Sequence, residues 1–313
     1  MRKILNFVLI ISSFFQFTSA FAQENPPCPS QFTQSCTFMD DILQNKHFKT
    51  RDNYHHSGNG ETNYYLSSQI TSSSSLLTLS TKIVPPGKQY NCNEAGSCKY
   101  ISGWVDTQGL WSTAGVNHGY VEVSATMPVS PEGKNPDGRY EGMWPAIWML
   151  PNDEGAGWPT HGEIDISELH GANPFNSGTT LHYNTVPGST TYYDGTFAQN
   201  PYTAISPVTY ASYHTYGLEW NFNSNAPYLT TWYDGKPVAI RYLNVADKTH
   251  HSNLYSSVFL PGQSSGFYLI LNIATGGAFG PTTSNTSDDS GKDMNNPTLQ
   301  MNINSIKSWR FND

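Results

Sequence analysis

Apolar and polar residues alternate with a period of two along most of the chain. Between residues 119 and 127, Val121, Val123, Ala125 and Met127 are separated by polar or aromatic residues. This spacing is typical of a strand with one face against a core. Similar runs predict strands at 76–84, 179–183, 214–220, 228–233, 238–242 and 267–274.

Turn residues separate these runs, and no segment shows a convincing helical period. Asp234-Gly235 lies between two of the runs and predicts a tight hairpin, because such turns favour residues that tolerate positive φ. Many short strands with no low-complexity linker between them indicate an all-β, antiparallel sandwich. We expect an irregular lead-in at 23–45 and a single domain at 46–313.

The amino terminus has the features of a signal peptide. Arg2 and Lys3 precede an apolar run at 4–17, and Ala20 and Ala22 provide the small residues of a cleavage site. The run is too short to span a membrane comfortably. We therefore expect cleavage after residue 22 and a soluble mature protein that is secreted, either outside the cell or into a periplasm.

Four cysteines in an exported chain favour disulfide bonds, because the compartment is oxidising. Three pairings are possible, and we favour Cys28 with Cys36 and Cys92 with Cys98, since both pairs are local and lie in turn-rich stretches. A structural zinc site is the alternative. Neither pair has the short C-x-x-C spacing of such a site.

The composition limits the kind of partner. Only 13% of the residues are charged and another 13% are aromatic, and the formal net charge is -8. An acidic chain lacks the basic surface that nucleic acids or anionic membranes require. We therefore expect no nucleic-acid or membrane partner, and a monomer with a neutral, hydroxyl-rich ligand.

Three acids stand close together in the segment H-G-E-I-D-I-S-E-L at 161–169. The isoleucines between them mark the core face, so Glu163 and Asp165 share the opposite face. Strict alternation would bury Glu168 in the core, where a lone carboxylate is costly. One extra residue, a β-bulge at 166–167, would return it to the acidic face, and we predict that bulge.

Paired carboxyl groups are the catalytic groups of glycosidases. A retaining glycosidase uses two of them about 5 to 5.5 Å apart, one as nucleophile and one as acid. Long glutamates at the ends and a shorter aspartate between them suit that geometry. The alternatives are solvated strand residues or a calcium site.

The motifs around these acids resemble glycoside hydrolase family 16, most closely its laminarinase-type members with the signature E-x-D-x-x-E. The resemblance covers roughly residues 45 to 311. It is carried by G-M-W-P-A-I-W-M-L-P at 142–151, W-P-T-H-G-E-I-D-I-S-E at 158–168, L-H-Y at 181–183, Y-G-L-E-W at 216–220, W-Y-D-G at 232–235 and L-I-L-N-I-A-T-G-G at 269–277.

The resemblance implies a concanavalin-like β-jelly-roll with a concave substrate cleft. It implies that Glu163 is the nucleophile, Asp165 its helper and Glu168 the general acid/base of an endo-acting, retaining enzyme that cleaves β-1,3-glucan or mixed β-1,3-1,4-glucan. Three alternatives remain on the same fold. They are a non-catalytic β-glucan-binding protein, a transglycosylase, and a hydrolase of agar, carrageenan or xyloglucan.

Five further residues are candidates for substrate binding. Trp144 and Trp158 stand next to prolines, where an exposed indole can stack on a sugar, and core packing is the alternative. His182 follows the acids and can position the acid/base, or be structural. Asn272 and Glu61 resemble cleft residues of the family, although an in-strand hydrogen bond is as plausible for the asparagine.

The remaining tryptophans and histidines are assigned to structure. Trp148, Trp220 and Trp309 are expected in the core. The pairs His55-His56 and His250-His251 lack metal-ligand spacing, so we expect solvated loops and no catalytic metal. We expect no required cofactor. Some family members bind structural calcium near the last strand, but M-N-I-N at 301–304 lacks the usual aspartate, so calcium stays open.

Overall fold

The computed structural model describes residues 25–130, 140–153, 158–159, 161–172, 178–183, 193–199, 212–223, 227–243, 259, 263–277 and 299–312. Strands form nearly all of the regular structure in these ranges, together with the 3-10 turns η1 (Ser67–Gln69) and η2 (Asn93–Ala95). Within the same ranges, no helix is long and apolar enough to cross a membrane.

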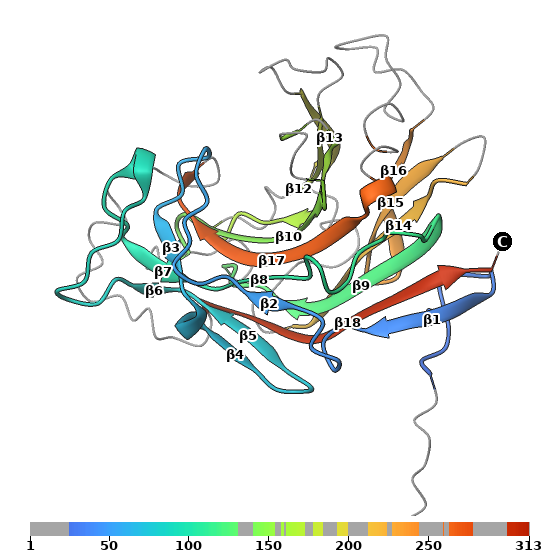
Figure 1. The fold of residues 1–313 in the computed structure, drawn as a ribbon, viewed down its shortest axis with the longest axis horizontal. Coiled ribbons are helices and arrows are strands. Elements are labelled where there is room, and N and C mark those ends of the chain that lie inside the picture. Colours follow the sequence, from blue (N-terminus) through green and yellow to red (C-terminus); the bar gives the residue numbers. More distant parts are fainter. Residues whose placement is uncertain are drawn as a thin grey trace, which may run out of the picture.

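Two large sheets form the layers of the molecule (Figure 1). In the described part of the chain, the first has eight strands: β16 (Lys236–Tyr242), β15 (Tyr228–Tyr233), β14 (His214–Asn221), β9 (His118–Thr126), β18 (Gln300–Phe311), β5 (Leu77–Ser80) and β4 (Ile70–Ser72) in spatial order, with β1 (Cys36–Asp41) also paired to β18.

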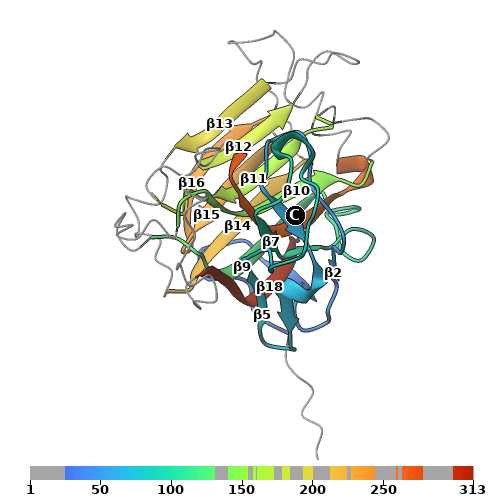
Figure 2. The same cartoon turned by 90° about the vertical axis from the view of Figure 1, so that its left-hand side faces the viewer.

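The second sheet has seven strands over the described residues and carries the predicted acids. Its order is β13 (Tyr193–Gln199), β12 (Gly178–Tyr183), β11 (Glu163–Glu168), β10 (Met143–Pro151), β17 (Phe267–Thr275), β8 (Trp104–Asp106) and β2 (Lys49–Thr50). Figure 2 shows the two layers from the side.

A small third sheet joins β3 (Asn63–Tyr65), β7 (Tyr100–Ser102) and β6 (Lys82–Ile83). Its β3–β7 pair is parallel, and the other strand pairings described are antiparallel. The architecture is therefore the predicted all-β jelly-roll sandwich.

The hydrophobic core fills the space between the two large sheets. Val121 and Val123 of β9 contribute from one side and Ile147 and Leu271 from the other, and all four are essentially inaccessible to solvent. Strand β17 is buried on both faces. Its second face belongs to a separate aromatic cluster on the outer side of the seven-stranded sheet, which is where the acids lie.

The predicted strands and the hairpin are present, with one difference. The run at 76–84 is divided into β5 and β6, which belong to different sheets and are separated by Thr81. Thr81 is buried and its hydroxyl contacts that of Ser102 at 2.8 Å. Asp234 and Gly235 have φ values of 48° and 68° and join β15 to β16, as the turn requires.

Both predicted disulfides form, Cys28–Cys36 and Cys92–Cys98. The prediction of an irregular lead-in over 23–45 is wrong for β1, because Cys36–Asp41 pairs with β18 in the eight-stranded sheet. A register shift between Phe38 and Asp40 interrupts the alternation of this short strand. A bulge in a six-residue strand leaves too few alternating positions to be recognised from sequence.

Candidate active site

A bulge in β11 brings the three acids to one face of the seven-stranded sheet. Across β10, residues 146, 147 and 148 face Glu168, Ser167 and Asp165 in turn, so Ile166 is the extra residue. The register with β12 shifts over the same stretch. Ile166 lies in the core, and the predicted bulge is confirmed. It restores Glu168 to the side occupied by Glu163 and Asp165.

Two tryptophan side chains donate hydrogen bonds to the outer acids. The indole N–H of Trp158 lies 2.8 Å from Oε2 of Glu163, and that of Trp144 lies 3.0 Å from Oε1 of Glu168. Trp158 is 52% exposed, which is unusual for an indole and leaves its ring accessible. Both tryptophans predicted near the substrate are therefore at the acids, where each also fixes the position of a carboxyl group.

His182 completes this group from the neighbouring strand β12. It lies directly across from Glu163 in the strand register. Its Nε2 is 3.1 Å from Oδ2 of Asp165 and 3.6 Å from Oε1 of Glu163. The imidazole also lies near the ring of Trp158, at 5.9 Å between centroids. The predicted site histidine thus contacts two of the three acids.

Burial and mutual repulsion raise the proton affinity of the acids. Desolvation, and then the charge of Asp165, raises the pKa of Glu163 to about 8, although His182 and the N–H of Trp158 lower it. Desolvation and Asp165 also raise the pKa of Glu168 well above its ordinary value. Like charges this close cannot all ionise at neutral pH, so the site retains protons for acid catalysis.

The raised pKa of Glu168 has a consequence for stability. Between its unfolded value of 4.5 and its higher folded value, the folded protein keeps a proton that the unfolded chain has released. Stability therefore falls as the pH rises through this window. We expect Glu168→Gln, which stays neutral and can still accept the N–H of Trp144, to be more stable than the wild type at pH 8.

Thermal unfolding measured at pH 4 and pH 8 checks this expectation. At pH 8 the variant should have the higher Tm, because only the wild type keeps a proton there that its unfolded chain has released. At pH 4 both proteins carry a neutral group, and their Tm values should agree. An equal gain at both pH values would show that the effect is packing rather than the proton.

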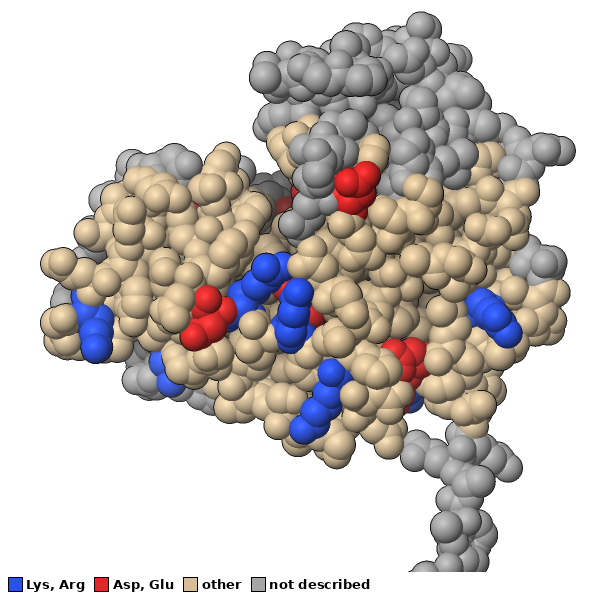
Figure 3. All heavy atoms as spheres, in the orientation of Figure 1, with Lys and Arg blue, Asp and Glu red and all other residues tan. Residues whose placement is uncertain are grey.

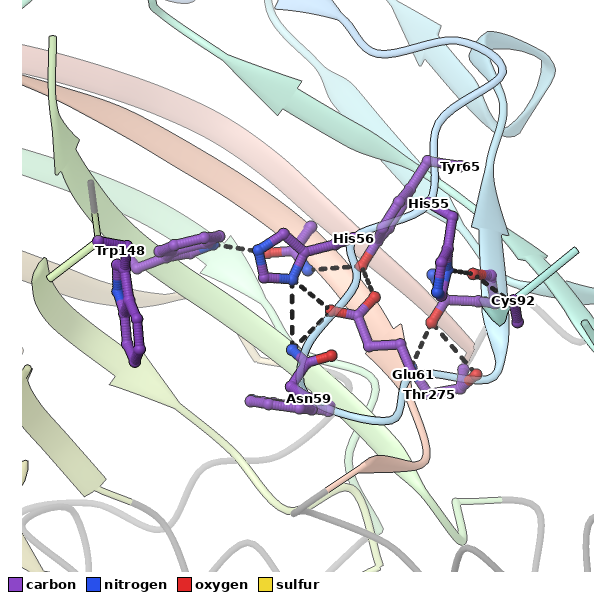
Figure 4. A network of polar contacts seen from close by, with 12 residues as sticks. His55, His56, Asn59, Glu61, Tyr65, Cys92, Trp148 and Thr275 are labelled. Carbon is purple, nitrogen blue, oxygen red and sulfur yellow. Dashed lines mark hydrogen bonds and ion pairs between the residues drawn. The ribbon is translucent and has the colours of Figure 1, made fainter. Parts of the chain in front are cut away.

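Asn272 and Glu61 are joined through the hydroxyl of Tyr65 in one hydrogen-bonded network, and Figure 4 shows the contact between Glu61 and Tyr65. Asn272 is on β17, opposite Ala146, which is itself opposite Glu168. Its amide accepts a hydrogen bond from Trp148 at 2.8 Å and donates to the hydroxyl of Tyr65 at 2.9 Å. These are structural hydrogen bonds, although they join the asparagine to side chains of two other strands, β10 and β3, rather than within its own strand.

Glu61 belongs to this network through the same tyrosine. The Tyr65 hydroxyl donates to Oε2 of Glu61 at 2.6 Å, and Glu61 itself is only 2% exposed. Glu61 is anchored to the end of β17 by a bridge to Gly276. Its carboxylate is almost fully buried, and its hydrogen-bond partners lie between it and the predicted cleft face or beside it.

The three tryptophans assigned to the core are all buried, but each lies in a different cluster. Trp220 lies in the central core and Trp309 in a third cluster on the outer side of the eight-stranded sheet. Trp148 is 7% exposed, yet it lies opposite Asp165 and belongs to the aromatic cluster on the acid face. It forms the floor beside the acids rather than part of the central core.

The prediction of solvated histidines at 55 and 56 holds only in part, because both residues are half-buried and hydrogen-bonded. Nδ1 of His55 lies 3.1 Å from the carbonyl oxygen of Asn63, and Nδ1 of His56 lies 3.1 Å from Oε1 of Glu61. The loop folds back onto the aromatic cluster, so its hydrophilic sequence overestimates how exposed these two histidines are. The other predicted pair, 250–251, lies outside the described residues.

Among the residues that the structure describes, two groups of side chains have donor atoms close enough to hold a cation. Glu163, Asp165 and His182 form the first, with ligand atoms within 4.8 Å of one another. The second combines His55 with Cys92 and Cys98, but these cysteines are joined in a disulfide and are not thiolate ligands. The zinc alternative for this cysteine pair therefore does not apply.

Comparison with known proteins identifies relatives of this chain. The profile of Glycosyl hydrolases family 16 matches residues 88–265, more than half of the chain. A glucan endo-1,3-beta-glucosidase from Cryptopygus antarcticus is 29% identical over 225 residues, which cover 68% of each protein. Glucan endo-1,3-beta-glucosidase A1 from Niallia circulans is 28% identical over 240 residues, and the match spans only 30% of that longer protein.

The fold has solved counterparts as well. The laminarinase from Rhodothermus marinus superposes with a TM-score of 0.61 at 20% sequence identity, over 90% of this chain and 100% of that chain. At this identity the likeness shows a shared fold. It supports the jelly-roll architecture.

Proposed function

Because the chain belongs to glycosyl hydrolases family 16, we propose that it is an endo-acting, retaining hydrolase of β-1,3-glucan, including mixed β-1,3-1,4-glucan. The observation that carries the proposal is the bulged strand, which sets Glu163 and Glu168 on one face, each hydrogen-bonded by a tryptophan. The relatives described as glucan endo-1,3-beta-glucosidases support the choice of substrate.

In the first step, protonated Glu168 gives its proton to the glycosidic oxygen while ionised Glu163 attacks the anomeric carbon. The bond to the leaving sugar breaks, a glycosyl ester forms on Glu163, and Glu168 is left as a carboxylate. In the second step, Glu168 takes a proton from water, whose oxygen attacks the same carbon and releases Glu163. Two inversions give net retention of configuration.

The neighbours of each acid suit these roles. The N–H of Trp158 and the charge of His182 both lower the pKa of Glu163 and so favour its ionised form. Asp165 raises the pKa values of both Glu163 and Glu168, which keeps a proton available for the acid. The pair titrates as a unit, so the proton it shares belongs to the site rather than to either residue alone. We infer that Glu168 carries that proton in the reactive state, because the attack on the anomeric carbon needs Glu163 ionised.

We further propose that the mature protein acts as a secreted monomer on a neutral polysaccharide, with no required cofactor. The two disulfides suit an oxidising compartment. Charged side chains are sparse on the face shown in Figure 3, which suits an uncharged polymer better than a sulfated one. Two carboxyl groups supply the nucleophile, the acid and the base of the reaction.

A panel of polysaccharides tests this proposal. Purified protein is incubated with laminarin, mixed-linkage glucan, xyloglucan, agar and carrageenan, and the products are sized. We expect the average chain length of laminarin to fall from the start of the reaction. Oligosaccharides of intermediate length should be seen before small sugars, because the enzyme cuts within the chain. Tight binding without cleavage would indicate a glucan-binding protein. Products longer than the substrate would indicate a transglycosylase, and cleavage of agar or carrageenan alone would contradict the substrate.

A further inference from the structure

The loop from Tyr54 to Glu61 lies against the aromatic cluster beside the acids. It is held to the sheet at its two ends. Tyr54 forms a bridge with Tyr65 of β3, and Glu61 forms one with Gly276 beyond β17. The backbone N–H of Thr62 also donates to the carbonyl of residue 275 at 2.8 Å. Side chains in this loop therefore have defined positions on the acid face.

Three polar side chains contact the buried carboxylate of Glu61 (Figure 4). It accepts hydrogen bonds from the Asn59 amide at 2.9 Å and the Tyr65 hydroxyl at 2.6 Å, and its Oε1 lies 3.1 Å from Nδ1 of His56. A buried carboxylate needs such partners to offset its desolvation. The same contacts fix the orientation of the His56 ring, because Nδ1 must face Glu61.

The other side of His56 faces the floor of the acid site. Its ring centroid lies 5.9 Å from that of Trp148 and 5.7 Å from that of Trp104. Trp148 is directly across from Asp165 in the strand register. The charge of His56 is also among the influences that lower the pKa of Glu163. The His56 side chain keeps 32% of its surface exposed, unlike the 2% of its partner Glu61.

We propose that His56 is a substrate-binding residue of this site, which hydrogen-bonds a hydroxyl group of a glucose unit bound next to the acids, and that Glu61 is the positioning residue that orients it. The inference rests on the proposed function. An imidazole has a polar edge for a hydroxyl and a flat face for the apolar side of a sugar, and here it is oriented in advance.

A purely structural role for His56 makes a different prediction. If the ring only covers Trp104 and Trp148, its removal lowers stability and leaves substrate affinity of the folded enzyme unchanged. If the ring binds substrate, affinity falls whatever happens to Tm. The neighbouring His55 provides a matched control, because it belongs to the same loop but contacts the Asn63 carbonyl, on the side of Cys92 (Figure 4).

Steady-state kinetics on laminari-oligosaccharides test the proposal with His56→Ala, His56→Gln and His55→Ala, together with their Tm values. One hydrogen bond is worth about 0.5–1.5 kcal/mol, so we expect KM to rise roughly 2- to 12-fold in His56→Ala with kcat within about twofold. His56→Gln should recover part of the loss, since glutamine can still hydrogen-bond a hydroxyl. His55→Ala should keep the wild-type KM.

The role of Glu61 is tested by combining Glu61→Gln with His56→Ala. If Glu61 acts through His56, the rise in KM of the double variant stays below the product of the two single effects. A full product would overturn the positioning role. An unchanged KM in His56→Ala, or an equal rise in His55→Ala, would overturn the binding role.

The wild-type protein separates this inference from the proposed function. If it does not hydrolyse laminari-oligosaccharides, the proposed function fails, and calorimetric titration with laminarihexaose then tests His56 by itself. Weaker binding in His56→Ala, by the same 2- to 12-fold, would support the inference. Equal binding by both proteins, or no binding by either, would overturn it.

Discussion

Replacement of Glu163 by alanine is expected to reduce kcat on laminarin by roughly 10⁴-fold or more, because the reaction loses the group that attacks the anomeric carbon. Trp158 and His182 would lose a partner, but no group of the fold's core changes, since Glu163 lies on the outer face of the sheet. Stopped assays of reducing-sugar release, with circular dichroism to verify folding, measure the effect.

Sodium azide shows whether the lost group is the nucleophile. In Glu163→Ala, azide can enter the vacated space and attack the sugar directly while Glu168 still supplies the proton. Activity should return, and the product should be an α-glycosyl azide, because only one inversion has occurred. Glu122→Gln provides the control, since Glu122 is a hydrogen-bonded, partly buried glutamate on β9 of the other sheet. It should keep wild-type activity.

Replacement of Glu168 by alanine is expected to affect the reaction according to the leaving group. Cleavage of laminarin should fall by about 10² to 10⁴-fold, because an unprotonated sugar alkoxide leaves poorly. An aryl β-glucoside of an acidic phenol needs no proton to leave, so its glycosylation step should be nearly unaffected. The glycosyl ester on Glu163 should then accumulate, since no base activates water.

Azide distinguishes this variant from the first. It should intercept the ester in Glu168→Ala and give a β-glycosyl azide, the product of two inversions. An α-azide from this variant would mean that the roles of Glu163 and Glu168 are exchanged. Equal losses on laminarin and on the activated glucoside would mean that Glu168 acts in some way other than as an acid.

The position of the three acids on one face, and the bulge that places them there, could be predicted from the sequence. Without a bulge, the alternation of the strand would conflict with the cost of burying a carboxylate. Strict alternation would have placed the Glu168 carboxylate in the core between residues that are apolar, and one extra residue was the smallest change that avoided this. The register across β10 shows that extra residue at Ile166. The sandwich could also be predicted, because most of its strands keep an alternation of apolar and polar residues with a period of two.

The surroundings of the acids were harder to predict. Hydrogen bonds from Trp144 and Trp158 to the carboxylates depend on ring orientation, which residue spacing does not contain. His56 meets Trp148 only because the loop folds back over β10, a contact between residues far apart in sequence. Strand β1 was missed because its bulge hides the alternation. Period-two patterns report which face is buried, not which side chains meet across it.

The assignment of Glu163 as nucleophile is tested most directly by trapping the glycosyl enzyme. The wild-type protein is incubated with a 2-deoxy-2-fluoro-β-laminaribiosyl fluoride, which forms the ester readily but hydrolyses slowly, and its peptides are analysed by mass spectrometry. The account predicts one sugar adduct, located on Glu163. An adduct on Glu168 or Asp165, or turnover of the fluoride by a folded enzyme with no adduct at all, would contradict it.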